Sequence, residues 1–181
     1  MKIDWASITI KELAAIVCSA LNKNNIEAIL VGGACVSIHS GNKYVSYDLD
    51  FVTHATVKEV TKVMAQLGFE KGGARHYIRN DCQFFIEMVA PPVALGNEPV
   101  TKFDKLKTKQ GILVMLTATD CVKDRLSAYY HWNDQQALEQ ALLVVAGQAV
   151  NIGEIKRWSI QEGHVDKFDE FRKLLKARRK T

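Results

Sequence analysis

The sequence predicts an α+β fold in which a mixed sheet flanked by helices is followed by a helical C-terminal region. Up to about residue 118, short strand patterns alternate with segments whose apolar residues recur every three to four positions. From Thr119 onward, every apolar pattern has helical spacing. We therefore expect a core over residues 1–118 and a helical subdomain over residues 119–181. A chain of 181 residues, 48% of them hydrophobic, is long enough to bury such a core.

Capping signals mark the expected helix starts. Thr9 with Glu12, and Thr56 with Glu59, have the spacing of capping boxes, in which a hydroxyl and a carboxylate satisfy backbone N–H groups reciprocally. They predict helices that end near residues 24 and 67. Thr119 is expected to cap the first of four C-terminal helices, and the last two are expected over about 151–161 and 164–177.

The strands are predicted from short apolar or alternating runs. AILVGG is expected to be a buried strand that ends in a tight turn, and ACVSIHSG a short helix that follows it. YDLDFVT alternates strictly, which predicts a strand with one acidic face. FEKGG, RHYIRN and CQFFIEMV follow as short strands, and FDKLKTKQGILVML as a hairpin that turns near residues 109–111.

Composition excludes several classes of protein. The four cysteines are scattered singly, which is not the framework of a small secreted domain, and no apolar run is long enough to span a membrane. A cytoplasmic protein is therefore expected. The net charge is +4, and residues 156–181 alone carry nine Lys/Arg and four Asp/Glu. This basic end predicts either contacts with phosphates, including RNA, or a solvated helix end.

Asp48 and Asp50 are the strongest candidates for chemistry. Side chains two residues apart on a strand share a face, so the two carboxylates repel each other unless a cation or a basic group lies between them. Mg²⁺, or Mn²⁺, prefers such oxygen ligands and commonly takes one or two carboxylates together with substrate phosphates. The alternative is that both residues are simply the solvent-facing half of an edge strand.

Two further features strengthen the interpretation of Asp48 and Asp50 as a metal site. Gly32 and Gly33 end the preceding strand, where glycines let backbone N–H groups approach a triphosphate, although an ordinary tight turn has the same sequence. Glu87 is a single acid in the apolar run FFIEMV. If its strand lies beside that of Asp48 and Asp50, it completes a three-carboxylate site; otherwise it pairs with a basic residue at the sheet edge.

The segment ILVGGACVSIHSGNKYVSYDLDFV resembles the signature of the DNA polymerase β-like nucleotidyltransferase superfamily, and most closely its AbiEii-type, abortive-infection and type IV toxin-like branch. Ser46 and the segment TATDCVKDRLSAYYHWND also fit that branch. The resemblance covers about the first 140 residues. It implies that Asp48, Asp50 and Glu87 are catalytic and bind Mg²⁺, and that Gly32 and Gly33 lie against the phosphates of an NTP.

The resemblance implies transfer of a nucleoside monophosphate from an NTP to a hydroxyl of an RNA, a protein or a small molecule. Ser46, Lys43 and Arg125 are the further candidates for nucleotide binding; for Arg125, its helix position favours it over Lys123 as the group that faces the cleft. The alternative is an inactive binding module or a toxin component with a cognate antitoxin. It is motivated by Tyr44, where an arginine is common, and by the 14 residues between Gly33 and Asp48.

Overall fold

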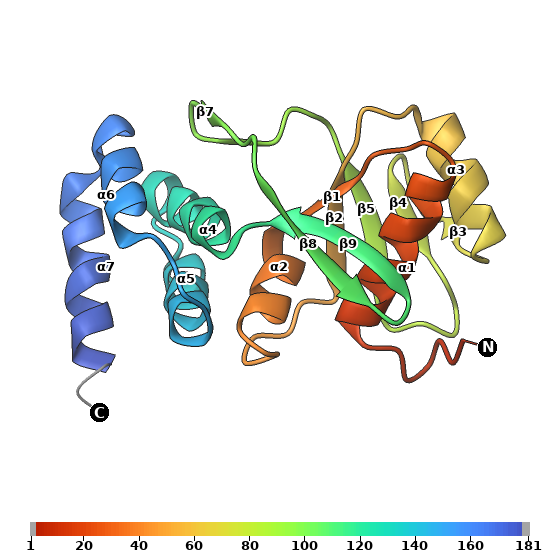
Figure 1. The fold of residues 1–181 in the computed structure, drawn as a ribbon, viewed down its shortest axis with the longest axis horizontal. Helices are drawn as coiled ribbons and strands as arrows, with labels where there is room; N and C mark the ends of the chain where they lie inside the picture. The colour runs from red at the N-terminus through yellow and green to blue at the C-terminus, as the bar shows by residue number, and fades with distance from the viewer. Residues whose placement is uncertain (1–2, 179–181) are drawn as a thin grey trace.

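The computed structural model describes residues 3–178, which form a seven-stranded mixed sheet, a two-stranded hairpin and seven helices. Figure 1 shows the sheet and its helices at one end of the molecule and the last four helices at the other. The core elements are α1 (Ile10–Lys23), β1 (Ile29–Val31), α2 (Gly32–His39), β2 (Asp48–Val52), α3 (Val57–Gln66), β3 (Glu70–Lys71), β4 (His76–Ile78), β5 (Phe85–Val89), β6 (Ala94–Leu95), β7 (Glu98–Pro99), β8 (Phe103–Thr108) and β9 (Gly111–Leu116).

The helical part begins directly after the last strand. Its elements are α4 (Ala118–Trp132), α5 (Gln135–Gly147), α6 (Ile152–Gln161) and α7 (Val165–Arg178). The change from strand to helix therefore falls at the expected residue 118. The expected basic end, residues 156–181, lies in α6 and α7, except residues 179–181, which are outside the described residues. Within residues 3–178, no helix is both long enough and apolar enough to cross a membrane.

The sheet has the strand order β3-β4-β5-β2-β1-β9-β8. Neighbours are antiparallel except for two parallel pairs, β2 with β5 and β1 with β9. The predicted hairpin is confirmed as β8 and β9, which turn between Thr108 and Gly111. The hairpin of β6 and β7 was not predicted; each of its strands has only two residues.

Both capping boxes are confirmed. The Thr9 and Thr56 hydroxyls accept hydrogen bonds from the third backbone N–H of α1 and α3, and Glu12 and Glu59 accept from the two cap N–H groups. The expected cap at Thr119 is wrong. The hydroxyl of Thr117 accepts from the N–H of Asp120, so Thr117 caps α4, two residues earlier than predicted.

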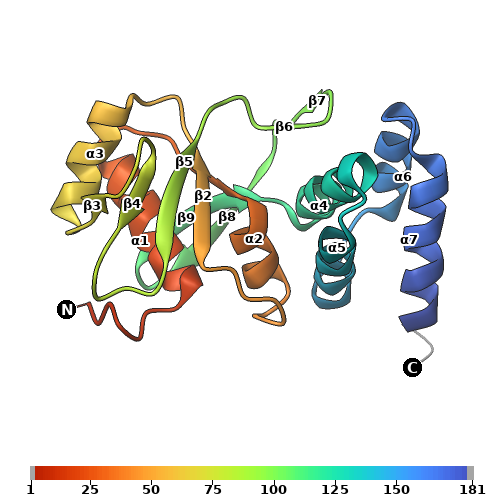
Figure 2. The same ribbon diagram turned by 180° about the vertical axis from the view of Figure 1, so that it is seen from behind.

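Helices cover one face of the central strands and leave the other partly open. The apolar residues of β2 and β5, Leu49, Phe51, Ile86 and Met88, are buried, whereas the residues between them are half-buried or exposed. Helix α1 lies in front of these strands in Figure 1 and behind them in Figure 2. The acidic face of β2 is therefore the face turned away from α1.

Candidate active site

Strand register brings the three predicted carboxylate residues to one face. Strands β2 and β5 are parallel, and Asp48 pairs with Phe85 while Asp50 pairs with Glu87. Directly paired residues of neighbouring strands point to the same side of a sheet. Asp48, Asp50 and Glu87 therefore belong to the face that α1 leaves open, with Glu87 exposed and the two aspartates half-buried.

The two glycines join β1 to α2 without an intervening loop. Val31 is the last strand residue and Gly32 the first helical residue. Gly32 has a φ of +68°, and a Cβ there would collide with the carboxylate of Asp50. A Cβ at Gly33 would lie 2.8 Å from the Ser46 hydroxyl. The backbone at the start of α2 thus approaches the aspartate face as closely as glycine permits, with its N–H groups at the positive end of a helix.

Asp48 is held by a relay of serine hydroxyls. The Ser46 hydroxyl donates to Oδ1 of Asp48, and the Ser46 backbone N–H donates to Oγ of Ser37 at 2.9 Å. Ser37 Oγ in turn donates to the carbonyl oxygen of Gly33 at 3.3 Å. Ser37 and Ser46 are both buried. The relay fixes the Asp48 carboxylate relative to the glycine turn.

Replacing Ser37 by alanine is expected to disturb this geometry without touching the carboxylates. The buried N–H of Ser46 and carbonyl of Gly33 would lose their common partner, which costs about 1 to 3 kcal/mol of unfolding free energy. We expect about a tenfold loss of the transfer activity proposed below, because small displacements of a reacting group have effects of that size or larger. The exposed Ser7 offers the control Ser7→Ala, and equal activity of both variants would contradict a role for the relay.

The surroundings of Asp50 disfavour its charged form. Burial, followed by the negative charges of Asp48 and Glu87, raises the pKa of Asp50 from 3.8 to about 6. The positive charge of Arg125 on α4 acts in the opposite direction. The helical part therefore contributes a cation to the carboxylate cluster of the core.

Arg125 is held in place by neighbours from two helices. Its guanidinium contacts Oδ2 of Asp124 at 2.5 and 3.0 Å, and NH1 donates to Oε1 of Gln140 on α5 at 3.4 Å. Four-fifths of its side chain is buried. Sequence reasoning missed Asp124, Gln140 and Ser37. The sequence could have indicated Asp124, because it directly precedes Arg125.

The remaining cations are not gathered at the carboxylates. Lys43 is exposed in the segment between α2 and β2, and within residues 3–178 no hydrogen bond or ion pair joins it to the three acids. Arg79 binds Asp81 and the carbonyl oxygen of Leu67. Lys123 is buried in a separate acidic cluster. Arg125, which is paired with Asp124, is the basic group whose charge acts on Asp50.

The residues present fit a divalent cation that is shared with a substrate. Asp48 and Asp50 offer two hard oxygen ligands on one face, and a cation would relieve the repulsion that raises the pKa of Asp50. Mg²⁺ commonly completes such a pair with phosphate oxygens and water. Throughout the part of the chain that the structure describes, no group of three or more His, Cys, Asp or Glu side chains is placed to hold a metal ion, so the protein's own ligands would be the two aspartates.

Solved structures provide the comparison that decides the fold. A nucleotidyltransferase-like antigenic protein from Paracoccidioides brasiliensis superposes with a TM-score of 0.56 over 80% of this chain and 78% of its own, at 17% identity. The chain has a nucleotidyltransferase fold. ANT(2'')-Ia, solved in complex with adenylyl-2''-tobramycin, gives a TM-score of 0.51 at 11% identity and covers 93% of this chain and 97% of its own. No protein-family model and no curated protein sequence matches the chain.

The comparison with ANT(2'')-Ia extends over the helical part as well as the core, since it covers 93% of this chain. The predicted α+β fold, with a mixed sheet followed by helices, is confirmed. The nucleotidyltransferase fold agrees with the fold that the resemblance implied, whereas membership of the superfamily and of its AbiEii-type branch stays a prediction.

Proposed function

We propose that the protein is a nucleotidyltransferase that moves a nucleoside monophosphate from an NTP to a hydroxyl group of an RNA, a protein or a small molecule. The observation that carries this proposal is the arrangement of Asp48, Asp50 and Glu87 on one face of the sheet, with Asp50 against the glycine turn at the start of α2. A nucleotidyltransferase fold supports it.

The phosphates would lie between the glycine turn and the two aspartates. Backbone N–H groups at the start of α2 would bind phosphate oxygens, because no side chain separates them from the aspartate face. Asp48 and Asp50 would hold Mg²⁺ or Mn²⁺, which when bound would neutralise phosphate charge during transfer. Arg125, already near Asp50, would add a fixed positive charge beside the transferred group.

Glu87 would act as the base for the acceptor hydroxyl. Strand β5 lies on the side of β2 away from β1, so Glu87 is separated from the glycine turn by the two aspartates. Its carboxylate would accept the proton of the acceptor hydroxyl as the hydroxyl oxygen bonds to the α-phosphorus. The bond from that phosphorus to the bridging oxygen breaks, and pyrophosphate leaves with its electron pair.

NTP binding can be measured before the acceptor is known. At about 100 times the dissociation constant, an NTP with Mg²⁺ stabilises a protein by about 2.7 kcal/mol, which for this size of chain corresponds to a rise in Tm of about 5 to 10 °C. We expect such a shift with one or more of ATP, CTP, GTP and UTP, and its loss in Asp48→Asn. The matched control is Asp104→Asn, which removes an exposed strand aspartate remote in sequence from the site.

The acceptor can be identified by following the transfer of a labelled nucleotide. Incubation with the stabilising NTP, labelled at the α-phosphate, is expected to label RNA, protein or a small hydroxylated molecule, and the labelled fraction identifies the class. Absence of any thermal shift with the four NTPs would contradict the proposal. It would favour the alternative that the fold acts as a binding module or as a toxin component with an antitoxin partner.

A further inference from the structure

The hairpin of β6 and β7 connects the core to the helical part by a second route. In sequence it lies between β5, which carries Glu87, and β8. In Figures 1 and 2 it extends from the sheet toward α4 and α6. The first connection between the two parts is the chain itself, which passes from β9 into α4.

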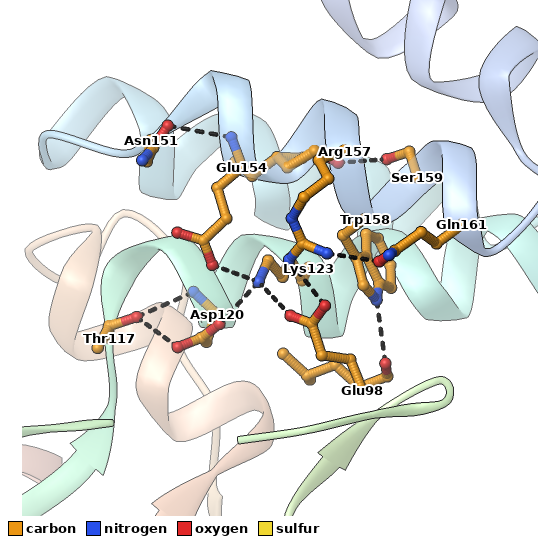
Figure 3. A network of polar contacts seen from close by, with 12 residues as sticks. Glu98, Thr117, Asp120, Lys123, Asn151, Glu154, Arg157, Trp158, Ser159 and Gln161 are labelled. Atoms are coloured by element: carbon orange, nitrogen blue, oxygen red, sulfur yellow. Dashed lines mark hydrogen bonds and ion pairs between the residues drawn. The ribbon is translucent and has the colours of Figure 1, made fainter. Parts of the chain in front are cut away.

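Lys123 of α4 is the centre of this second connection. Its ammonium is 1% exposed and lies 2.6 Å from Glu154 of α6, 3.0 Å from Glu98 of β7 and 3.2 Å from Asp120. Figure 3 shows the three carboxylates converging on it from α4, α6 and the hairpin. Burial lowers the pKa of Lys123, but the hydrogen bonds to Glu154 and Glu98 outweigh that effect and raise it. The lysine is therefore charged and joins three elements.

A second set of contacts surrounds the lysine. Glu98 also binds the Arg157 guanidinium at 2.7 Å, and the indole N–H of Trp158 donates to the carbonyl oxygen of Leu95 at 3.0 Å (Figure 3). The backbone N–H of Asn97 donates to Glu162 at 3.1 Å. The hairpin is thus bound to α6 by side chains and backbone together, and Glu98 is the one hairpin side chain that binds cations of both α4 and α6.

These contacts have a direct consequence for the candidate site. Arg125 lies two residues after Lys123 on the same helix, so a shift of α4 also moves its guanidinium. Glu87 lies on the strand that leads into the hairpin. The position of Arg125 relative to the core therefore depends on how α4 is held. The hairpin contributes to this together with α2, which packs against α4 and α5, and with the hydrogen bond from Gln148 to the His39 carbonyl oxygen.

We propose that Glu98 and Lys123 are positioning residues that help hold the helical part against the core and so set the position of Arg125 relative to the core. The expected effect on transfer rests on the proposed function. The geometric part of the inference is that the helical part keeps a fixed position on the core, and this does not depend on activity.

The geometric part is tested by distance measurement between spin labels on the full chain. Labels at Lys58→Cys on α3 and Lys173→Cys on α7 occupy exposed positions in the core and the helical part, with the half-buried Cys82 replaced by serine. We expect a narrow distance distribution in the parent. Glu98→Leu, which removes both hairpin ion pairs but leaves Lys123 its two other carboxylates, is expected to broaden or shift it, and Glu98→Gln to do so less.

The control removes an ion pair that does not involve the hairpin. Arg178 of α7 binds Glu139 of α5, and both are about half exposed. Glu139→Gln is expected to leave the distance distribution unchanged. An unchanged distribution in Glu98→Leu would overturn the proposal, as would equal broadening in Glu139→Gln.

The effect on transfer is tested by a double-mutant cycle. Glu98→Leu is expected to lower kcat at least tenfold while the dissociation constant of the NTP changes less than threefold, because the core supplies the phosphate site. In the Arg125→Gln background the same change is expected to lower kcat less than twofold. If the double variant loses kcat by the product of the two separate losses, Glu98 does not act through Arg125, and this part of the proposal is overturned. If the parent transfers nothing, the proposed function fails, and the distance measurement alone decides the positioning role.

Discussion

Asp50→Asn is expected to lower the rate of nucleotidyl transfer by about a hundredfold to a thousandfold, the range found when one preorganised charge is removed from a reacting centre. Asp50 is the aspartate that faces both the glycine turn and Glu87. The asparagine side chain has nearly the same shape, so the loss reports the missing charge. Initial rates with the preferred NTP at saturating Mg²⁺ provide the measurement.

The same variant is expected to be more stable than the parent when no divalent cation is present. The pKa of Asp50 is raised from 3.8 to about 6 by burial and then by Asp48 and Glu87, so the folded state binds a proton more readily than the unfolded chain. Stability therefore falls as the pH rises between these two values, and the loss is complete above them. If the asparagine side chain restores about 1 kcal/mol of unfolding free energy, the Tm rises by about 2 to 4 °C. An active Asp50→Asn protein, or one with a lowered Tm, would contradict this assignment.

Lys123→Met is expected to lower the free energy of unfolding by about 3 to 5 kcal/mol. The substitution keeps the length of the side chain but removes the charge that Glu98, Asp120 and Glu154 share. Three carboxylates would then converge without a cation, and breaking a buried ion pair from one side leaves exactly this kind of uncompensated charge. Urea denaturation measures the change.

The exposed Lys156 on α6 supplies the matched control, because Lys156→Met removes the same charge from the surface. It is expected to change stability by less than about 0.5 kcal/mol. Equal stability of the two lysine variants would show that the acidic cluster does not need its cation.

Much of the fold could be predicted because local signals agree with the tertiary structure. The capping boxes at Thr9 and Thr56 fix two helix starts, and strict alternation around Asp48 and Asp50 fixes the face of β2. The cap of α4 was placed two residues late because Thr117 and Thr119 are both suitable residues, and only the tertiary structure selects between them. Local patterns also cannot give the strand order, which depends on contacts between distant segments.

The candidate site was accessible from sequence only where its residues form a local pattern. Asp48, Asp50 and the two glycines do so, and Glu87 was identified as an acid that an apolar strand does not explain. Ser37 resembles any small residue of a buried helix, and Gln140 lies on α5, more than fifty residues after Glu87 in the chain. The buried ion cluster of Lys123 combines α4, α6 and a hairpin, so no sequence window contains it.

The parallel pairing of β2 with β5 also limits how the chain can vary in length. Because strand side chains alternate, a slip of one residue in β5 would turn Glu87 to the covered face and bring a hydrophobic neighbour opposite Asp50. Insertions are absorbed in the exposed turn at Gly72 and Gly73, which lies outside both strands. We therefore expect an insertion in that turn to leave the carboxylate face intact, whereas inserting a single residue within β5 would move Glu87 away from Asp50.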